Sequence, residues 1–140
     1  MLPFLLSSLI ACGLDRHALR LEEQEKALLY QNAQRHWEGM RWGVPARAAA
    51  FYEDPLTRAR FESDLQSPYS RLVDVKVLHV ALDPKPESKE SSPARTALRR
   101  GTVYVRIEGF GTDNVLRIEE NKQRWYRNTN GWWIEYPPVK

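Results

Sequence analysis

The spacing of apolar residues along this 140-residue chain changes near residue 70, and this change limits the folds open to it. Before that point apolar residues recur at intervals of three and four, which places them on one face of an α-helix. After it they alternate with polar residues, as in half-buried β-strands. The length suffices for one hydrophobic core, whereas two cores would each be marginal. The pattern therefore predicts a single α+β domain with helices first and strands after.

The first half of the chain predicts two or three helices. The segment from Asp15 to about Arg41 is rich in Leu, Glu, Gln, Ala, Lys and Arg, which favour helix, and Gly43 marks its end. Its expected buried stripe consists of Leu19, Ala27, Tyr30, Ala33, Trp37 and Met40. Shorter helices are expected over 46–54 and 56–65, because Pro55 interrupts the pattern between them.

The second half predicts about four strands in a curved antiparallel sheet. Alternating segments span 72–82, 102–110, 115–127 and 132–136. A Pro- and Ser-rich loop follows the first segment, and Gly/Asn-containing turns at 111–114 and 128–131 follow the second and third. Such short turns join antiparallel neighbours. Helices packed on one face of this sheet complete the expected fold.

The order of elements and one aromatic hairpin resemble a known superfamily. A long helix, an Ala/Phe-rich second helix and a meander ending in Gln123-Arg-Trp-Tyr126 and Gly131-Trp-Trp-Ile134 look like the nuclear transport factor 2-like fold. The resemblance implies a cone-shaped α+β domain and a candidate homodimer through the sheet. That superfamily includes isomerases, dehydratases, binding modules and domains without catalysis. Cystatin-like folds share the element order and are the fallback.

The N-terminus resembles an export signal. The first twelve residues are uncharged and mostly apolar, and charge begins at Asp15 and Arg16. The single cysteine, in Leu9-Ile10-Ala11-Cys12, resembles the lipobox of bacterial lipoproteins. The resemblance implies a signal segment at 1–11, an acylated tether over 12–24 that begins the long helix, and a domain over 25–140. A plain hydrophobic N-terminus with an incidental cysteine is the other interpretation.

The lipobox resemblance also implies a location. In that family the cysteine carries acyl chains, and two or more chains hold a soluble domain stably on a bilayer. Gly13, rather than Asp, follows Cys12, which by the family's sorting habit indicates the outer membrane, with the domain facing the periplasm of the bacterial cell envelope.

Three histidines are the first candidates for acid–base chemistry, because their pKa lies nearest neutrality: His17, His36 and His79. His79 shares the phase of Val73, Val75 and Val77, so it is expected to face inward. A candidate pocket would then combine Tyr30, Trp37, Phe51, Tyr52 and His79. No nearby carboxylate has the spacing to complete a dyad, so a structural histidine is favoured and no catalytic residue is assigned.

No motif predicts a metal or a cofactor. The chain lacks His-x-x-x-His and Glu-x-x-His spacings, a glycine-rich phosphate loop and a Gly-x-Ser-x-Gly elbow. Glu119 and Glu120 are neighbours on a predicted strand, so their side chains point to opposite faces.

The aromatic hairpin offers a candidate partner surface. Alternation puts Trp132, Ile134 and Tyr136 on one face and Trp133 on the other. Trp133, Arg117 and Arg124 are the residues expected to contact a partner. Arginines near aromatic side chains also suit nucleic acid, but the export signal argues against that ligand, and the net charge is only +3.

Two functional hypotheses follow from the sequence. The first is a non-enzymatic envelope lipoprotein, tethered through Cys12, that binds a protein partner or an envelope component. The alternative is a small-molecule-binding protein or a lyase- or isomerase-type enzyme that uses the interior of the cone. An interior filled by Trp37, Phe51, Phe61 and Trp132 favours the first, whereas a pocket with convergent polar groups favours the second.

Overall fold

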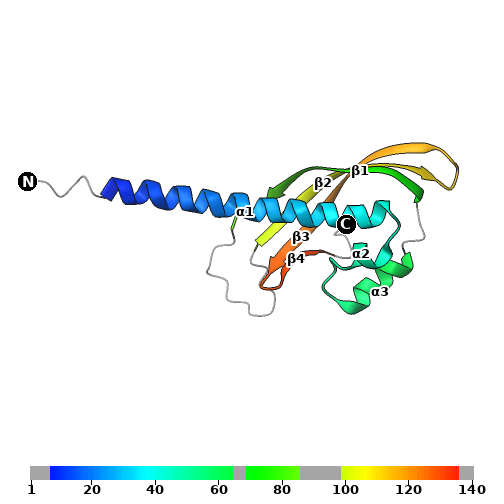
Figure 1. Cartoon of the computed structure of the whole chain (residues 1–140), viewed down its shortest axis with the longest axis horizontal. Helices are drawn as coiled ribbons and strands as arrows, with labels where there is room; N and C mark the ends of the chain where they lie inside the picture. The colour runs from blue at the N-terminus through cyan, green and yellow to red at the C-terminus, as the bar shows by residue number, and fades with distance from the viewer. Residues whose placement is uncertain (1–6, 65–68, 86–98, 136–140) are drawn as a thin grey trace, which may run out of the picture.

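The computed structural model describes residues 7–64, 69–85 and 99–135, and in it helices cover one face of a four-stranded antiparallel sheet (Figure 1). Along the chain the elements are α1 (Ser7–Arg41), α2 (Pro45–Ala49), α3 (Pro55–Asp64), β1 (Tyr69–Leu82), β2 (Arg99–Gly111), β3 (Leu116–Asn128) and β4 (Gly131–Ile134). The predicted α+β class, with helices before strands, is confirmed. The residues of the Pro- and Ser-rich loop from 86 on, and those from Tyr136 on, lie outside the described ranges.

The helices begin and end at recognisable signals. α1 starts at Ser7 rather than Asp15, because no proline interrupts the helix-compatible residues between them. It ends where Gly43 adopts a φ of +64°. α2 has only five residues, shorter than the predicted 46–54. Pro55 is the first residue of α3, whose N-terminus Asp54 caps by accepting a 3.0 Å hydrogen bond from the Thr57 N–H.

The strands form a meander in the order β1-β2-β3-β4, each antiparallel to the next. β2 and β3 pair without interruption, and Asn114, with a φ of 57°, lies in the turn between them. Gly131, with a φ of +129°, closes the turn between β3 and β4. Both predicted turns are confirmed.

β1 is irregular, and this irregularity curves the sheet. Its register against β2 shifts at three places, between Tyr69 and Arg71, between Leu72 and Asp74, and between Val77 and His79. Each bulge adds an unpaired residue, increases the local twist and changes the face to which the following side chains point. The sheet bends over the helical layer in consequence (Figure 1).

The core lies between α1, α2 and the inner face of the sheet. Its buried residues are Leu29, Ala33, Tyr52, Val77, Val103, Val105, Ile107, Trp125, Trp132 and Ile134. α1 packs mainly over β1 and reaches β2 at Gly101, where a Cβ atom would lie 2.8 Å from Leu29 Cδ2. The predicted helical stripe is wrong at its N-terminal end, because Leu19 is 62% exposed and Ala27 is exposed.

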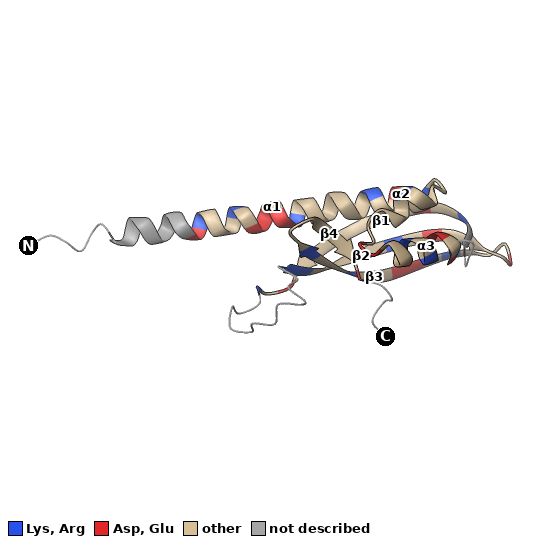
Figure 2. Ribbon diagram, turned by 90° about the horizontal axis from the view of Figure 1, so that it is seen from below, with Lys and Arg blue, Asp and Glu red and all other residues tan. Residues whose placement is uncertain are grey.

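Leu19 is exposed because α1 extends past the body it covers (Figures 1 and 2). Ala27 is exposed because it lies on the helix face opposite Leu29 and Ala33. Residues 15–21 are all exposed. The first contacts with the sheet are ion pairs, from Arg99 to Glu22 at 3.0 Å and from Arg127 to Glu25 at 3.1 Å. At about 1.5 Å per residue, the helix from Ser7 to Leu21 projects roughly 22 Å beyond this anchor.

Candidate functional site

The interior of the domain is built around His36, which projects from α1 onto the inner face of the sheet. His36 follows Leu29 and Ala33 at helical spacing and is only 1% exposed. Aromatic rings surround it from three other elements or their flanks, with centroid distances of 6.1 Å to Phe51, 5.9 Å to Phe61 and 6.2 Å to Trp125. These side chains fill the space between the helices and the sheet.

Hydrogen bonds fix the protonation state of His36. Its Nδ1 lies 2.8 Å from the Ala48 carbonyl oxygen, which can only accept, so Nδ1 carries the proton. Nε2 then accepts from the amide of Gln123 at 3.3 Å, and Gln123 Oε1 accepts from the indole N–H of Trp125 at 2.8 Å. Burial lowers the pKa of His36 to about 4, partly opposed by the bond to Ala48. The imidazole is therefore neutral at pH 7 and both of its nitrogens are engaged.

Four of the five residues predicted for a pocket contribute to this interior. Tyr52 is buried, and Tyr30, Trp37 and Phe51 are half-buried against the core. The Tyr30 hydroxyl donates to the Val77 carbonyl at 3.5 Å. Four side chains were expected to distinguish a filled interior from a pocket. All four pack within or against the same core: Trp37, Phe51, Phe61 and Trp132.

The inward orientation predicted for His79 is wrong. His79 is exposed and stacks on Tyr104 of β2, with ring centroids 4.1 Å apart. The bulge between Val77 and His79 breaks the alternation on which the prediction rested, so Val77 faces the core and His79 does not. His36, which the sequence analysis did not place in the pocket, occupies the interior instead. Its spacing from Leu29 and Ala33 was the available signal.

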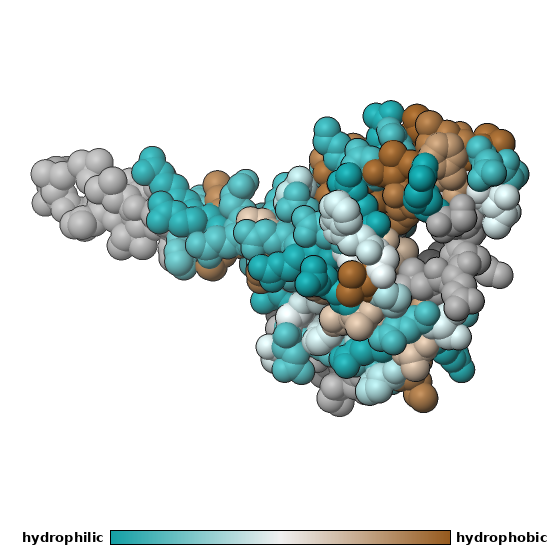
Figure 3. Space-filling model, turned by 45° about the vertical axis from the view of Figure 1, so that its right-hand side comes forward, coloured by the Kyte–Doolittle hydropathy of each residue, from teal (hydrophilic) through white to brown (hydrophobic). Residues whose placement is uncertain are grey.

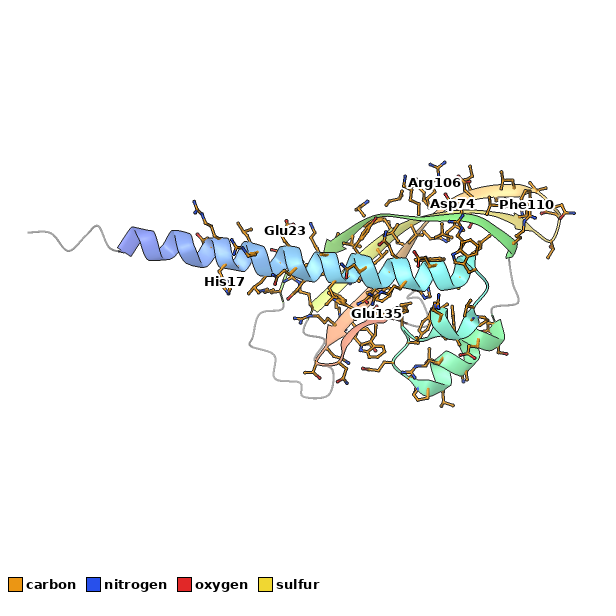
Figure 4. All side chains as sticks on the ribbon, viewed as in Figure 1. His17, Glu23, Asp74, Arg106, Phe110 and Glu135 are labelled. Atoms are coloured by element: carbon orange, nitrogen blue, oxygen red, sulfur yellow. The ribbon has the colours of Figure 1, made fainter. Side chains whose placement is uncertain are left out.

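The outer face of the sheet, turned away from α1, is polar and aromatic. Arg106 and Phe110 project from this side in Figure 4, whereas Asp74 forms an ion pair with Arg41 of α1 at 3.5 Å. Because β2 and β3 pair without shifts, alternation assigns their even-numbered residues to this face.

Arg124 and Trp133 share this outer face near the β3–β4 hairpin. Trp133 is half-buried and donates through its indole N–H to Asn128 Oδ1 at 2.9 Å. Arg124 donates to Asp83 and to Thr102 Oγ1, both at 2.6 Å. The Arg124 guanidinium lowers the pKa of the Asp83 carboxyl by hydrogen bonding, and Asp83 raises the pKa of Arg124.

A tyrosine on the same face is held by an acidic neighbour. The Tyr126 hydroxyl donates to Glu53 Oε1 at 3.2 Å. Burial, followed by the nearby charge of Glu53, raises the pKa of Tyr126 to about 12. Tyr126 is therefore neutral at physiological pH and serves as a hydrogen-bond donor.

Arg117, the third residue predicted for the partner surface, lies elsewhere. It is opposite Gly109 at the far end of β3, on the other face of the strand, and forms an ion pair with Asp113 in the adjoining turn. The structure therefore brings together Arg124 and Trp133 but not Arg117.

Cys12 lies on the helical backbone of the projecting part of α1. Its side chain lies outside the described part of the structure, so acylation remains a prediction. None of the described helices is long and apolar enough to cross a membrane.

The described residues contain no group of three or more His, Cys, Asp or Glu side chains that could hold a metal ion. Comparison with protein-family models, curated proteins and solved structures finds no match.

Proposed function

We propose that this protein is a bacterial envelope lipoprotein, a non-enzymatic binding domain that acylated Cys12 tethers to the outer membrane. The proposal includes the nuclear transport factor 2-like assignment of the domain, whose helices cover a curved antiparallel sheet. The observation that carries it is the projecting part of α1. That segment joins the candidate lipidation site to a compact body through exposed helical turns.

The geometry of this segment suits a spacer. Cys12 precedes the first ion-paired residue, Glu22, by ten positions, which is about 15 Å along a helix. Residues 15–21 are exposed and include His17, Arg16 and Arg20. A polar helical stalk of this kind keeps a folded body clear of lipid headgroups, and its basic residues are attracted to anionic headgroups.

The filled interior supports binding rather than catalysis. An enzyme that uses the cone interior needs a cavity with accessible polar groups. The interior histidine is instead buried, neutral and hydrogen-bonded at both nitrogens, and aromatic rings pack around it. The outer face, with Arg124 and half-buried Trp133, is then the surface proposed to meet a protein partner or an envelope component.

Replacing the cysteine tests the anchor. We expect Cys12→Ser to leave the domain folded but to move it from the membrane fraction to the soluble fraction of the native host, and to abolish incorporation of labelled palmitate. Ser7→Ala, in the same segment but outside the lipobox-like residues, is the matched control and should stay in the membrane fraction. Intact-mass measurement of an unprocessed, unacylated chain that begins at Met1 would overturn the proposal.

A further inference from the structure

The two long edges of the sheet differ in regularity. β1 is interrupted by three register shifts, which make it a poor template for another strand. β3 pairs with β2 in unbroken register, and β4 covers its other edge only from Trp125 to Asn128. Among the described strands, none pairs with that edge between Leu116 and Gln123. Within the described residues, this segment is a regular edge whose outward backbone groups have no strand partner.

The direction of those backbone groups follows from the end of β4. The Arg124 carbonyl accepts a 3.0 Å hydrogen bond from the Glu135 N–H on the β4 side of β3. Since successive residues of a strand direct their N–H and C=O groups to opposite edges, Leu116, Ile118 and Glu120 direct theirs to the same edge as Arg124.

Apolar side chains accompany this edge. Leu116 and Ile118 are 49% and 53% exposed, and Phe110 lies opposite Leu116 on β2. Brown, apolar atoms gather over the upper part of the body in Figure 3. A regular strand edge that no described strand covers, with two exposed apolar side chains beside it, favours pairing with another strand.

We infer that β3 pairs antiparallel with β3 of a second copy, about a two-fold axis that passes through Ile118. The two sheets then become one continuous sheet, with both helical layers on the same side. The superfamily resemblance implies a candidate homodimer through the sheet, and this arrangement specifies it as pairing of strand edges. It does not depend on acylation of Cys12. A shared membrane would strengthen it by raising the effective concentration of the copies.

Charge selects the register of this pairing. A two-fold axis at Glu119 or Glu120 would place a glutamate directly opposite its own copy, which is unfavourable. An axis at Ile118 instead places Arg117 opposite the partner's Glu119, twice, and packs Ile118 against the partner's Ile118. Arg117 also pairs with Asp113 in its own chain, and its five N–H donors suffice for two carboxylates.

The position of β4 agrees with this register. The bond between Glu135 and Arg124 closes the edge from Arg124 onward, so an axis farther along β3 would drive the partner strand into β4. With the axis at Ile118, the paired segment is 116–120, which forms about six backbone hydrogen bonds. Residues 121–123 leave space for the turn that precedes the partner's β3.

Disulfide cross-linking of the full chain, with Cys12→Ser to remove the native cysteine, tests the register of the proposed β3–β3 pairing. With the axis at Ile118, the two Cα atoms of that residue lie about 5.5 Å apart, which suits a disulfide. We expect Ile118→Cys to cross-link at least about tenfold faster than the matched control Lys122→Cys, whose copies lie roughly 26 Å apart. Equal rates, or faster cross-linking at Lys122, would overturn the inference.

Charge exchange provides an independent test by sedimentation. Arg117→Glu and Glu119→Arg should each weaken self-association about tenfold, because each places like charges opposite one another at two symmetric sites. An equimolar mixture of the two variants should recover association, since the glutamate introduced in one chain would then face the arginine introduced in the other.

The control Lys122→Glu reverses a charge on the same strand outside the paired segment and should associate like the parent. Circular dichroism checks that each variant is folded. A parent chain that remains monomeric throughout, or a mixture that associates no better than either variant alone, contradicts the inference. Packing of sheet faces would instead survive both variants and be weakened by Arg106→Glu.

Discussion

His36 on α1 and Gln123 on β3 lie 3.3 Å apart, Nε2 to Nε2, and this contact joins the helical layer to the sheet inside the core. The Ala48 carbonyl engages the other side of the imidazole, and the Trp125 indole orients the Gln123 amide. A chain of hydrogen bonds therefore connects α1, α2 and β3, and His36 at its centre is buried. Buried polar groups of this kind stabilise only while every member keeps its partner.

Acid should destabilise the domain through His36. Its pKa is about 4 in the folded state against 6.5 unfolded, so the unfolded chain takes up the proton first. The contribution of the neutral His36 to the free energy of unfolding is complete above pH 6.5 and is lost as the pH falls toward 4. The loss should reach about 3 kcal/mol, at 1.36 kcal/mol per pKa unit.

Urea melts between pH 4 and 7.5 measure this slope. In that range the free energy of unfolding of His36→Gln should depend less on pH than that of the parent. The matched control His79→Gln, at an exposed position, should keep the pH dependence of the parent. The pKa of Asp83 is lowered from its ordinary value of 3.8, so this carboxyl affects stability only at pH values below the range of these melts. A parent profile that is flat from pH 6.5 to 4 would contradict the assignment.

Trp132 and Trp133 are adjacent tryptophans on opposite faces of β4. Trp132 is 3% exposed in the core, and Trp133 is half-buried on the outer face. Trp132→Ala should cost about 3–5 kcal/mol of unfolding free energy. Trp133→Ala should cost about 1 kcal/mol, mostly from its hydrogen bond to Asn128. Denaturant melts compare the two, and equal costs would mean that both faces of the hairpin are covered.

The regular parts of the fold were predictable because their signals are local. Apolar spacing identified the helical and strand halves, and the phase of Trp132 and Ile134 was right because β4 is short and pairs without shifts. Gly43 and Pro55 mark helix boundaries through their own backbone restrictions, which need no tertiary partner.

The site was less predictable because it depends on distant partners. The bulge that turns His79 outward exists only in the pairing of β1 with β2, and alternation within β1 does not reveal it. His36 is tolerated in the core because Ala48 and Gln123, 12 and 87 positions away, satisfy its nitrogens. The helical spacing of His36 from Leu29 and Ala33 signals its inward position, but a single sequence contains no local signal for the bulge in β1 or for the partners of His36.

Gly39 should be irreplaceable although it lies within a helix. A Cβ atom at this position would lie 2.8 Å from the backbone nitrogen of Ala48, so α1 and α2 pack backbone to backbone. Alanine favours helix over glycine by about 0.5–1 kcal/mol, but the clash should outweigh this gain. Gly39→Ala is expected to destabilise the domain by about 1–3 kcal/mol. Gln34→Ala, on the exposed side of α1, should change the melting temperature little.

Arg99 and Arg100 are neighbours at the start of β2 and provide the sharpest comparison of a buried with an exposed charge. The Arg99 side chain is 4% exposed and joins Glu22 at 3.0 Å, with Glu25 at 4.0 Å, where α1 leaves the body. The Arg100 side chain is 53% exposed and meets Glu135 at 3.6 Å.

Arg99→Ala should cost about 1.5–3 kcal/mol, because it removes the buried guanidinium that donates to Glu22 and leaves Glu25 with one cation, Arg127, instead of two. Arg100→Ala should cost about 1 kcal/mol or less, since water screens an exposed pair. Arg99→Met separates packing from charge, because it fills the same space without a charge. Adding Glu22→Gln should recover part of the stability, since it removes the carboxylate that Arg99→Met leaves without its cation. Chemical denaturation of the three variants and the double variant measures these differences. If Arg99→Ala and Arg100→Ala proved equally costly, the ion pairs at the base of the α1 stalk would not be what fixes the helix to the sheet.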